Sequence, residues 1–301
     1  MKKFIQILLI CIVLLMSFFT GCQKVKEYST FTDDMGRSVT LQKVPQRLVS
    51  HVPSITEMLF AIGLEDRIVG VSDYCDYPPE AKQKPSVGNY FNPSIENIVA
   101  LQPDLVLTDG HSESIKQLDS MNIPFIVIDP KDINGIIKDI ELLGKITGLE
   151  SRANELVRQM NEEMNTVTSK VGNLSRVRVF YIVDFTDPNN PWTAGPGSFI
   201  DWIINTAGGE NIASKASGDY VQYSVEQIVS DDPQIIIYPE VHGSSFVDIA
   251  TLKNHPVWKE TTAVKQDMLF AVDADLVSRN GPRITQGLLE VARIIHPEAF
   301  K

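Results

Sequence analysis

The sequence predicts an α/β protein of two similar lobes, each with a mostly parallel sheet flanked by helices, joined by one long backbone helix. The first observation is a stretch between Gly148 and Gly172 whose apolar residues recur at steps of three and four, the period of one helical face. Its length of about 22 residues corresponds to a rod of roughly 33 Å. A helix that long usually connects or braces other parts of a fold.

The second observation is an internal repeat on either side of that stretch. A Ser-x-Glu helix start followed by a strand occurs at residues 94–107 and again at 224–237, 130 positions later. The third observation is that strands alternate with helices in both halves, which favours parallel pairing. We therefore predict an N-terminal lobe, a connecting helix and a C-terminal lobe at residues 46–148, 149–171 and 172–301.

The first 21 residues have the pattern of a signal peptide. Lys2 and Lys3 precede an almost wholly apolar run that ends at Phe19, and small residues then lead to Cys22. This end resembles a lipobox, so we expect Cys22 to be lipidated and to anchor an exported protein on the outer face of the cytoplasmic membrane. Plain signal cleavage is the alternative. Residues 22–45 then read as a lipid tether followed by a hairpin.

That hairpin precedes the first lobe, and its two strands are predicted at residues 30–32 and 38–41 around a turn. A buried strand follows at 47–51, and Ser54 to Glu57 fits a capping box that starts a helix ending at Gly63. The remaining elements of the lobe are strands at 67–71, 104–108 and 124–128 and helices at 94–99, 115–121 and 133–143.

The second lobe repeats the alternation after Gly172. We expect a strand at 176–183, a loop at 191–197, a helix from Ser198 to Ala207, and then the second copy of the repeat with its strand at 234–238. A helix near 247–253, a strand at 268–272, a loop at 273–281 and a helix at 282–295 complete the lobe.

Composition excludes some classes of function. The chain carries 38 acidic and 27 basic side chains, a net charge of −11, and no basic stripe that would bind nucleic acid. The sequence has no nucleophile elbow, metalloprotease motif, Cys-x-x-Cys or phosphate loop. Cys75 is predicted to be a semi-buried small residue. A hydrolase or lyase that used the interlobe cleft would need a base beside it.

Glu96 and Glu226 occupy the same place in the two repeat copies, two residues after a serine that can cap a helix. Taken singly, each is explained by a carboxylate near the positive end of a helix dipole. As a matched pair at a fixed separation, they would form a two-point dock for a symmetric basic partner.

Aromatic residues on the predicted loops form a second group that favours ligand contact over core packing. They are Tyr74, Tyr90, Phe91, Trp192, Tyr220 and Tyr223. In open α/β sheets the ligand crevice lies beyond the carboxyl ends of the strands, where these loops gather. Asp275 and Arg279, on the predicted loop before the last helix, either pair with each other or contact ligand.

The five histidines are scattered, and no pair has the spacing typical of metal ligands. We expect no metal cluster. A metal receptor stays open only if His51, His111 and His242 converge on one point.

The lipobox, the Asp-x-x-Gly-Arg-x-Val hairpin at 33–39, the strand-Pro-Ser-x-Thr-Glu segment at 49–57, the paired glutamates and the long connector resemble a known family. It comprises the substrate-binding proteins of ABC importers for cobalamin, iron-siderophores and haem. The resemblance implies two α/β lobes that hold the ligand between them, and it implies that Glu96 and Glu226 meet arginines of the permease. It also implies a protein that is not an enzyme.

Within that family the run at 69–79 resembles cobalamin binders. The resemblance implies ligand-binding roles for Pro53, Tyr74, Tyr90, Trp192, Tyr220, Asp275 and Arg279. The chain departs from the pattern at Tyr90 and Tyr220, where tryptophan is expected, and at Asp109, which replaces another aromatic residue.

We therefore expect a monomeric, lipid-anchored receptor that has no cofactor, captures a corrinoid and delivers it to an ABC permease. A ferric siderophore would call for more basic residues in the cleft, and haem for an axial ligand such as His111 or a cleft tyrosine. The stiff connecting helix predicts only slight closure on ligand binding.

Overall fold

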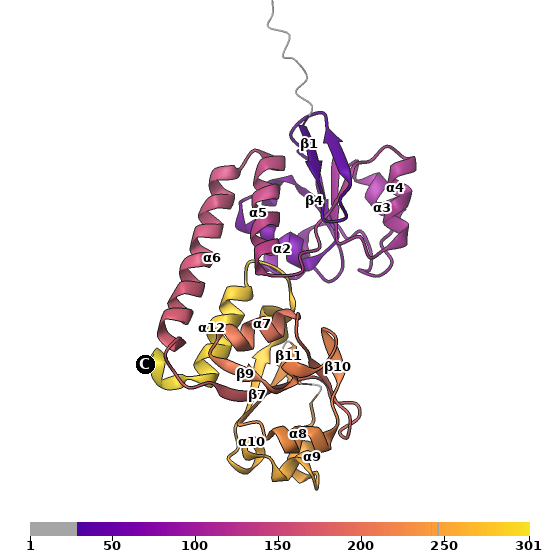
Figure 1. Ribbon diagram of the computed structural model, residues 1–301. Helices are drawn as coiled ribbons and strands as arrows, with labels where there is room; N and C mark the ends of the chain where they lie inside the picture. The colour runs from indigo at the N-terminus through magenta and orange to yellow at the C-terminus, as the bar shows by residue number, and fades with distance from the viewer. Residues whose placement is uncertain (1–28, 242, 246) are drawn as a thin grey trace, which may run out of the picture.

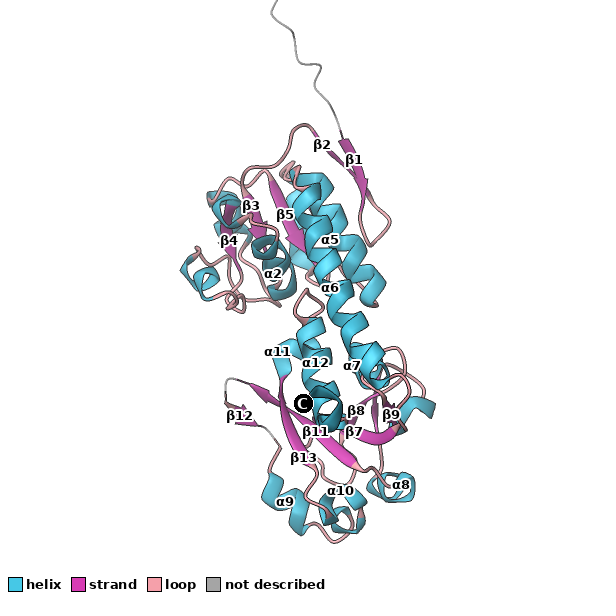
Figure 2. Cartoon of the chain, turned by 90° about the vertical axis from the view of Figure 1, so that its left-hand side faces the viewer, coloured by secondary structure: helices cyan, strands magenta, loops and turns pink. Residues whose placement is uncertain are grey.

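The long helix α6 (Glu150–Val171) runs beside both lobes of the computed structural model, which describes residues 29–241, 243–245 and 247–301 (Figure 1). Figure 2 shows α5 (Ile133–Thr147) and α6 packed together on the N-terminal lobe, with α6 continuing to α12 (Ile284–Ile295) of the C-terminal lobe. The prediction of one connecting helix is confirmed. Within the described ranges, none of the helices combines the length and apolar content that a membrane span requires. The predicted signal peptide and Cys22 lie outside these ranges.

The chain enters the N-terminal lobe through an antiparallel hairpin of β1 (Ser29–Thr32) and β2 (Ser38–Leu41), as predicted. Its turn depends on Asp33, whose buried carboxylate accepts hydrogen bonds from the backbone N–H groups of Met35, Arg37 and Val127. The Arg37 guanidinium donates to the same carboxylate and lies over the Phe125 ring. The Asp-x-x-Gly-Arg pattern thus attaches the hairpin to the sheet.

The N-terminal lobe contains a four-stranded parallel sheet in the order β4-β3-β5-β6. Its strands are β3 (Leu48–Ser50), β4 (Ile68–Val71), β5 (Leu105–Thr108) and β6 (Phe125–Val127). The helices between them, besides α5, are α2 (Pro53–Ala61), α3 (Ile95–Ala100) and α4 (Gln117–Ser120). All residues of β3, β5 and β6 are buried, as expected for parallel strands covered on both faces.

The C-terminal lobe has four parallel strands with the same arrangement, in the order β9-β7-β11-β13. They are β7 (Val177–Asp184), β9 (Gly209–Asn211), β11 (Ile235–Val241) and β13 (Leu269–Asp273). In both lobes the parallel strand that comes second in the sequence lies at the edge of the four, next to the first. The third strand pairs with the other side of the first, and the fourth pairs with the third. The repeated helix-to-strand units supply the third strand of each lobe, β5 and β11, which confirms that the lobes are similar.

Three short antiparallel strands extend the second sheet: β8 (Trp192–Ala194), β10 (Tyr220–Gln222) and β12 (Ser244–Ser245). Its other helices are α7 (Phe199–Thr206), α8 (Val225–Asp231), α9 (Ile249–Asn254), α10 (Thr262–Lys265) and α11 (Ala274–Ser278). Single 3₁₀ turns are η1 (Glu65–Arg67), η2 (Pro79–Gln83), η3 (Glu113–Lys116), η4 (Ile212–Lys215), η5 (Trp258–Glu260) and η6 (Pro297–Phe300).

Helix α6 begins within one residue of its predicted start. Gly148, at a φ of 72°, adopts the left-handed conformation that ends α5, and the chain turns directly into α6. One narrow stripe of α6 is buried, through Ala153, Met160, Val167 and Val171. This stripe contacts α5 at one end of the helix and α12 at the other, so one amphipathic helix joins both lobes.

The structure corrects three sequence predictions. The predicted loops at 191–197 and 273–281 contain β8 and α11, because Trp192 and Thr193 pair with β7 in the first and one helical turn forms in the second. The capping box at Ser54 is wrong: Pro53 is the first helical residue, and Val52 holds the N-cap position without a side-chain hydrogen bond. A proline there lacks only an N–H that would be unpaired in any case.

Candidate functional site

A cavity of about 390 Å³ lies between the lobes, where loops from both of them meet. Each strand of the N-terminal sheet supplies part of its wall immediately after the strand ends. Residues 52–54 follow β3, Tyr74 follows β4, residues 109–111 follow β5, and residues 128–130 follow β6. The C-terminal lobe contributes residues 278–280. Parallel strands place their carboxyl ends at one edge, so this convergence is a direct result of the topology.

The N-terminal wall of this cavity is aromatic. Tyr90 stacks on His51 with ring centroids 5.7 Å apart and planes within 10°, and Phe91 meets Tyr90 edge-on at 4.9 Å. Tyr74 and Phe91 are 49% and 69% exposed, so both offer surface to an incoming molecule. Such a wall suits a flat or aromatic ligand.

Polar groups lock the position of Tyr90. Its hydroxyl donates a hydrogen bond to Asp109, and that carboxylate also accepts from the backbone N–H of His111 at 3.1 Å. Burial, followed by the hydrogen bond to Asp109, raises the pKa of the Tyr90 hydroxyl, which therefore stays protonated. Behind it, the Nδ1 atom of His51 lies 3.3 Å from the Thr108 hydroxyl. Burial lowers the pKa of His51, so its ring is neutral near pH 7.

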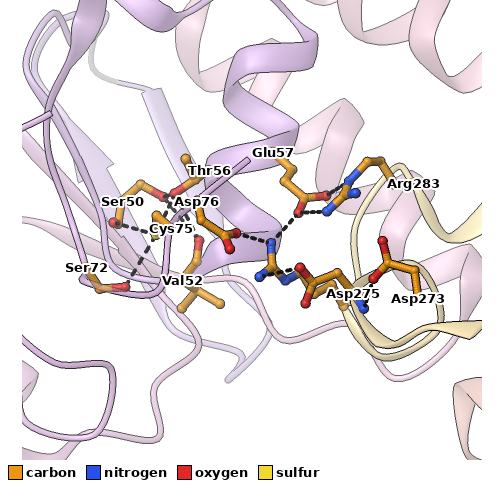
Figure 3. A network of polar contacts seen from close by, with 11 residues as sticks. Ser50, Val52, Thr56, Glu57, Ser72, Cys75, Asp76, Asp273, Asp275 and Arg283 are labelled. Carbon is orange, nitrogen blue, oxygen red and sulfur yellow. Dashed lines mark hydrogen bonds and ion pairs between the residues drawn. The ribbon is translucent and has the colours of Figure 1, made fainter. Parts of the chain in front are cut away.

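An ion-pair network that spans both lobes (Figure 3) meets the cavity at Arg279. Arg279 donates from Nη1 to Glu57 at 3.0 Å and to Asp76 at 2.7 Å, and its Nη2 lies 2.9 Å from Asp275. Arg283 binds Glu57 in a bidentate manner, at 2.9 Å and 2.7 Å. Glu57 and Asp76 belong to the N-terminal lobe, whereas both arginines belong to the C-terminal lobe.

The network is largely shielded from water. The Glu57 side chain is 1% exposed, and those of Arg279 and Arg283 are 16% and 11% exposed. Burial alone would lower the pKa of Arg279, but hydrogen bonds to Asp76 and Glu57 raise it above its usual value. Arg283 follows the same pattern through Glu57 and also lies over the Tyr77 ring at 3.8 Å. Because these charges are shielded from water, removing one partner would leave the other charge uncompensated and would be strongly destabilising.

The structure brings together four of the seven residues predicted to contact ligand: Pro53, Tyr74, Tyr90 and Arg279 all line the cavity. Asp275 touches the cavity only through Arg279, since its carboxylate pairs with that guanidinium. Trp192 and Tyr220 lie on the neighbouring strands β8 and β10 of the C-terminal lobe, exposed but outside the cavity lining.

Tyr223 was predicted to belong to the contact surface, and this is wrong. Its ring is buried at 5% exposure, and its hydroxyl donates to the Asp231 carboxylate and the Ile212 carbonyl. The Tyr223 ring lies 6.0 Å from the Phe180 ring of β7 between centroids, so the tyrosine is part of the core of the second lobe.

Glu96 and Glu226 occupy matching positions in the first turns of α3 and α8, and both are exposed. Ser94 and Ser224 cap these helices by accepting hydrogen bonds from the N–H groups of Asn97 and Gln227, as predicted. Each carboxylate thus sits at a capped helix start on a different lobe.

Cys75 does not have the surroundings of a nucleophile. Within the described residues, its sulfur contacts the hydroxyls of Thr56 and Ser72 at 3.1 Å and 3.3 Å and the Ser50 carbonyl, with no histidine among these partners (Figure 3). Burial raises the pKa of the Cys75 thiol. A catalytic cysteine would need a lowered thiol pKa, since the thiolate is the nucleophile.

The histidines do not form a metal centre in the part of the chain that the structure describes. His51 is buried behind Tyr90, whereas His111 is exposed at the cavity, with its Nε2 3.9 Å from an Asp129 oxygen. No group of three or more His, Cys, Asp and Glu residues there is arranged to hold a metal ion. His242, the third histidine of the metal-receptor alternative, lies outside the described residues.

Sequence reasoning missed the role of Glu57, Asp76 and Arg283. Two signals were present in the sequence. Pro53 at a helix start moves Ser54 out of the cap position and leaves Glu57 without a capping partner. Arg283 lies next to the start of α12, where the helix dipole disfavours a cation, so an acidic partner elsewhere in the fold was to be expected.

A larger hollow of about 1250 Å³ lies beyond the same network, against α2, α6 and the start of α12. Glu57 and Arg283 line this hollow, whereas Arg279 lines the interlobe cavity. The hollow is lined mainly by helix surfaces with charged side chains of both signs. The strand-end loops converge on the smaller cavity, so we take the smaller one as the ligand site.

Residues 48–276 match the family described as periplasmic binding protein. Among curated relatives, an uncharacterized ABC transporter substrate-binding lipoprotein, YvrC of Bacillus subtilis, is 32% identical over 288 residues, covering 93% of this chain and 89% of the relative. A vitamin B12-binding protein of Vibrio parahaemolyticus is 27% identical over 272 residues, covering 88% and 94%.

Solved structures agree with this architecture. The periplasmic vitamin B12 binding protein BtuF of Vibrio cholerae superposes with a TM-score of 0.70 at 25% identity, covering 86% of this chain and 99% of that one. The periplasmic heme-binding protein RhuT of Roseiflexus sp. RS-1, in its apo form, superposes with a TM-score of 0.74 at 26% identity, covering 84% and 99%.

Proposed function

Because the chain belongs to the periplasmic binding protein family, as a substrate-binding protein of the ABC-importer type and not an enzyme, we propose that it captures a corrinoid between its lobes. The observation that carries this proposal is the aromatic wall of Tyr74, Tyr90 and Phe91 facing a cavity at the strand ends. A corrinoid is flat, with an apolar ring and an amide-rich edge. Stacking on the wall supplies affinity, and the polar groups around Arg279 and Asp109 orient the edge.

Similarity supports the same ligand class. The vitamin B12-binding relative aligns over most of both chains. Trp192 and Tyr220 are exposed on the C-terminal lobe, and we propose that they form the opposing contact surface for a ligand that extends beyond the cavity. The second wall would then be completed by strands β8 and β10.

Delivery completes the proposed function. The binding protein acts outside the cytoplasm, and we propose that lipid on Cys22 holds a monomer at the outer face of the cytoplasmic membrane. Glu96 and Glu226 then dock two basic sites on the permease while the ligand is transferred.

Haem is the second candidate, because the exposed imidazole of His111 lines the cavity and can reach an iron from one side. Tyr74 lines the same wall. Spectroscopy separates haem from corrinoid directly, since axial ligation of ferric haem by His111 would be lost in His111→Ala. A ferric siderophore is the remaining alternative within the family.

Titration of the purified protein with cyanocobalamin, haemin and a ferric siderophore tests the proposal. We expect saturable heat with cyanocobalamin. Tyr90→Ala should weaken binding by roughly tenfold or more, because stacking and apolar burial are lost. Tyr90→Phe, the matched control, keeps the ring and should stay near the wild-type affinity. No heat with cyanocobalamin and a clear signal with the siderophore or haemin would reject the corrinoid.

A further inference from the structure

The charges around the interlobe cavity are unequally balanced. Two carboxylates, Asp109 and Asp129, line it, together with a single guanidinium, that of Arg279. That guanidinium already contacts the carboxylates of Glu57, Asp76 and Asp275. An anionic ligand group would have to compete with three intramolecular partners for the arginine.

Of the two carboxylates that line the cavity, Asp109 has less of its negative charge offset by nearby cations. Its residue is 8% exposed, and it accepts hydrogen bonds from the Tyr90 hydroxyl and the His111 N–H. Among the described residues, no lysine or arginine forms an ion pair with it, whereas Asp129 lies 2.5 Å from the Nζ atom of Lys131. The Asp109 charge therefore acts on whatever enters the cavity.

The sign of these charges determines which ligand groups the cavity attracts. A cavity with apolar walls focuses the field of the charges that line it, and such charges interact more strongly there than in water. A carboxylate or catecholate brought beside Asp109 is repelled. A primary amide or an ammonium group offers N–H donors to the same oxygens and is attracted.

We infer that the cavity selects its ligand by charge: it favours scaffolds whose edge carries neutral or cationic N–H donors over the same scaffolds carrying anionic groups, with Asp109 as the main specificity-determining residue. The inference rests on the proposed function only in that ligand binds at this cavity. It narrows the substrate class to fully amidated corrinoids and, outside corrinoids, to neutral or cationic metal chelates.

Matched ligand pairs test the inference by calorimetry at low salt. The first pair is cyanocobalamin and its monocarboxylic acid, in which one peripheral amide is hydrolysed. The second pair is ferrioxamine B, which carries an ammonium group, and its N-succinyl derivative, which carries a carboxylate. Within the pair that binds, we expect the amide or ammonium member to bind more tightly by about tenfold, a preference that shrinks as salt rises.

Single substitutions test which aspartate causes the preference for the amide or ammonium ligand. Asp109→Asn should reduce the affinity ratio within a pair by about three- to tenfold, because the repelling charge is gone while an oxygen remains to accept from Tyr90. Asp129→Asn should reduce it less, because Lys131 already offsets that charge. Asp119→Asn, on the exposed surface of α4, is the matched control and should leave the ratio unchanged. A purely structural effect of Asp109→Asn would weaken both members of a pair equally.

The outcomes separate this inference from the proposed function. If ferrioxamine B binds better than its succinyl derivative and neither corrinoid binds, the corrinoid assignment fails and charge selection stands. Equal binding within a pair overturns charge selection, even if cyanocobalamin binds well. A preference that survives in both aspartate variants also overturns it, and absence of binding by all four probes overturns both proposals.

Discussion

At the scale of single residues, the buried carboxyl group of Asp139 links the stability of the fold to pH. It lies on α5 with its side chain fully buried, and neither carboxylate oxygen has a hydrogen-bond partner among the described residues. Burial first, and the charge of the nearby Asp34 second, raise the pKa of Asp139 to about 8. The Asp34 carboxylate also accepts a hydrogen bond from the Asp129 N–H at 2.7 Å and lies 3.3 Å from the Nζ atom of Lys138.

We predict that Asp139 makes the protein less stable as pH rises. The folded protein holds this proton up to about pH 8, whereas an unfolded chain releases it near pH 4. Folding therefore binds a proton between these values, and the free energy of unfolding should fall by up to about 1.4 kcal/mol per pH unit across the window. Asp139→Asn should flatten this slope, as measured by urea unfolding from pH 5 to 8.

Asp119→Asn is the control for this measurement, because it removes an exposed carboxylate from the same lobe. Its slope should match the wild type. A wild-type slope that persists in Asp139→Asn would show that the proton is bound elsewhere.

At the scale of elements, the short helices α3 and α8 present the two candidate docking carboxylates. Both helices start at a serine cap, both carry glutamate at the second helical position, and both feed the third parallel strand of their lobe. An interaction with a helix dipole needs only one such residue at a time. The matched framework around the two glutamates is what a two-point contact with a partner requires.

We predict that Glu96→Arg together with Glu226→Arg blocks uptake and leaves ligand affinity intact, because neither residue lines the interlobe cavity. Affinity is measured by calorimetry, and uptake in proteoliposomes that contain the permease. The control pair Glu113→Arg and Glu260→Arg places the same charge changes on other exposed surfaces, one in each lobe. Normal uptake by the Glu96 and Glu226 double variant would remove their docking role.

Elements with a strong local signal were predictable from the sequence. The apolar stripe of α6, the serine caps of α3, α7 and α8, and the buried parallel strands all depend on residues close in sequence. Strand β8 was missed because its stability comes from pairing with β7 and β10, which no local pattern reveals. Helix α11 is a single turn, too short for a periodic signal.

The same distinction applies to the candidate site. Tyr74 and Tyr90 were expected at the cavity because loops after parallel strands converge in this class of fold. Pro53 was expected there only from the resemblance to cobalamin binders. The contacts of Glu57 with Arg279 and Arg283 join residues more than 200 positions apart, so only the arrangement of the two lobes places them together. Long-range ion pairs of this kind leave little trace in a single sequence.

At the scale of the whole molecule, two devices set the relative position of the lobes. Helix α6 packs against α5 and α12 and acts as a spacer on one side. The Glu57 network ties the lobes together next to the cavity, and Thr285 on α12 donates to Glu163 on α6 at 2.5 Å. A spacer alone permits rocking about its ends, whereas the network opposes any motion that separates Glu57 from Arg279 and Arg283.

We therefore predict that Glu57→Gln loosens the lobes as well as destabilising the fold. The substitution keeps the shape of the side chain but leaves two poorly hydrated guanidinium groups with less compensation, at a cost of about 3 kcal/mol. Spin labels at Ser120→Cys and Lys259→Cys, one on each lobe, report the interlobe distance by pulsed electron resonance. Without ligand, the distance distribution should broaden in Glu57→Gln relative to the wild type.

Glu155→Gln is the matched control, because Glu155 forms an exposed ion pair with Arg158 on the surface of α6, and ion pairs of this kind contribute little to stability. It should change neither stability nor distance appreciably. In the wild type, the distances with and without ligand should nearly coincide, because spacer and network together resist rotation. If instead the wild-type lobes rotate widely on binding while Glu57→Gln behaves as the wild type does, neither device restrains them and the lobes move as a hinged pair.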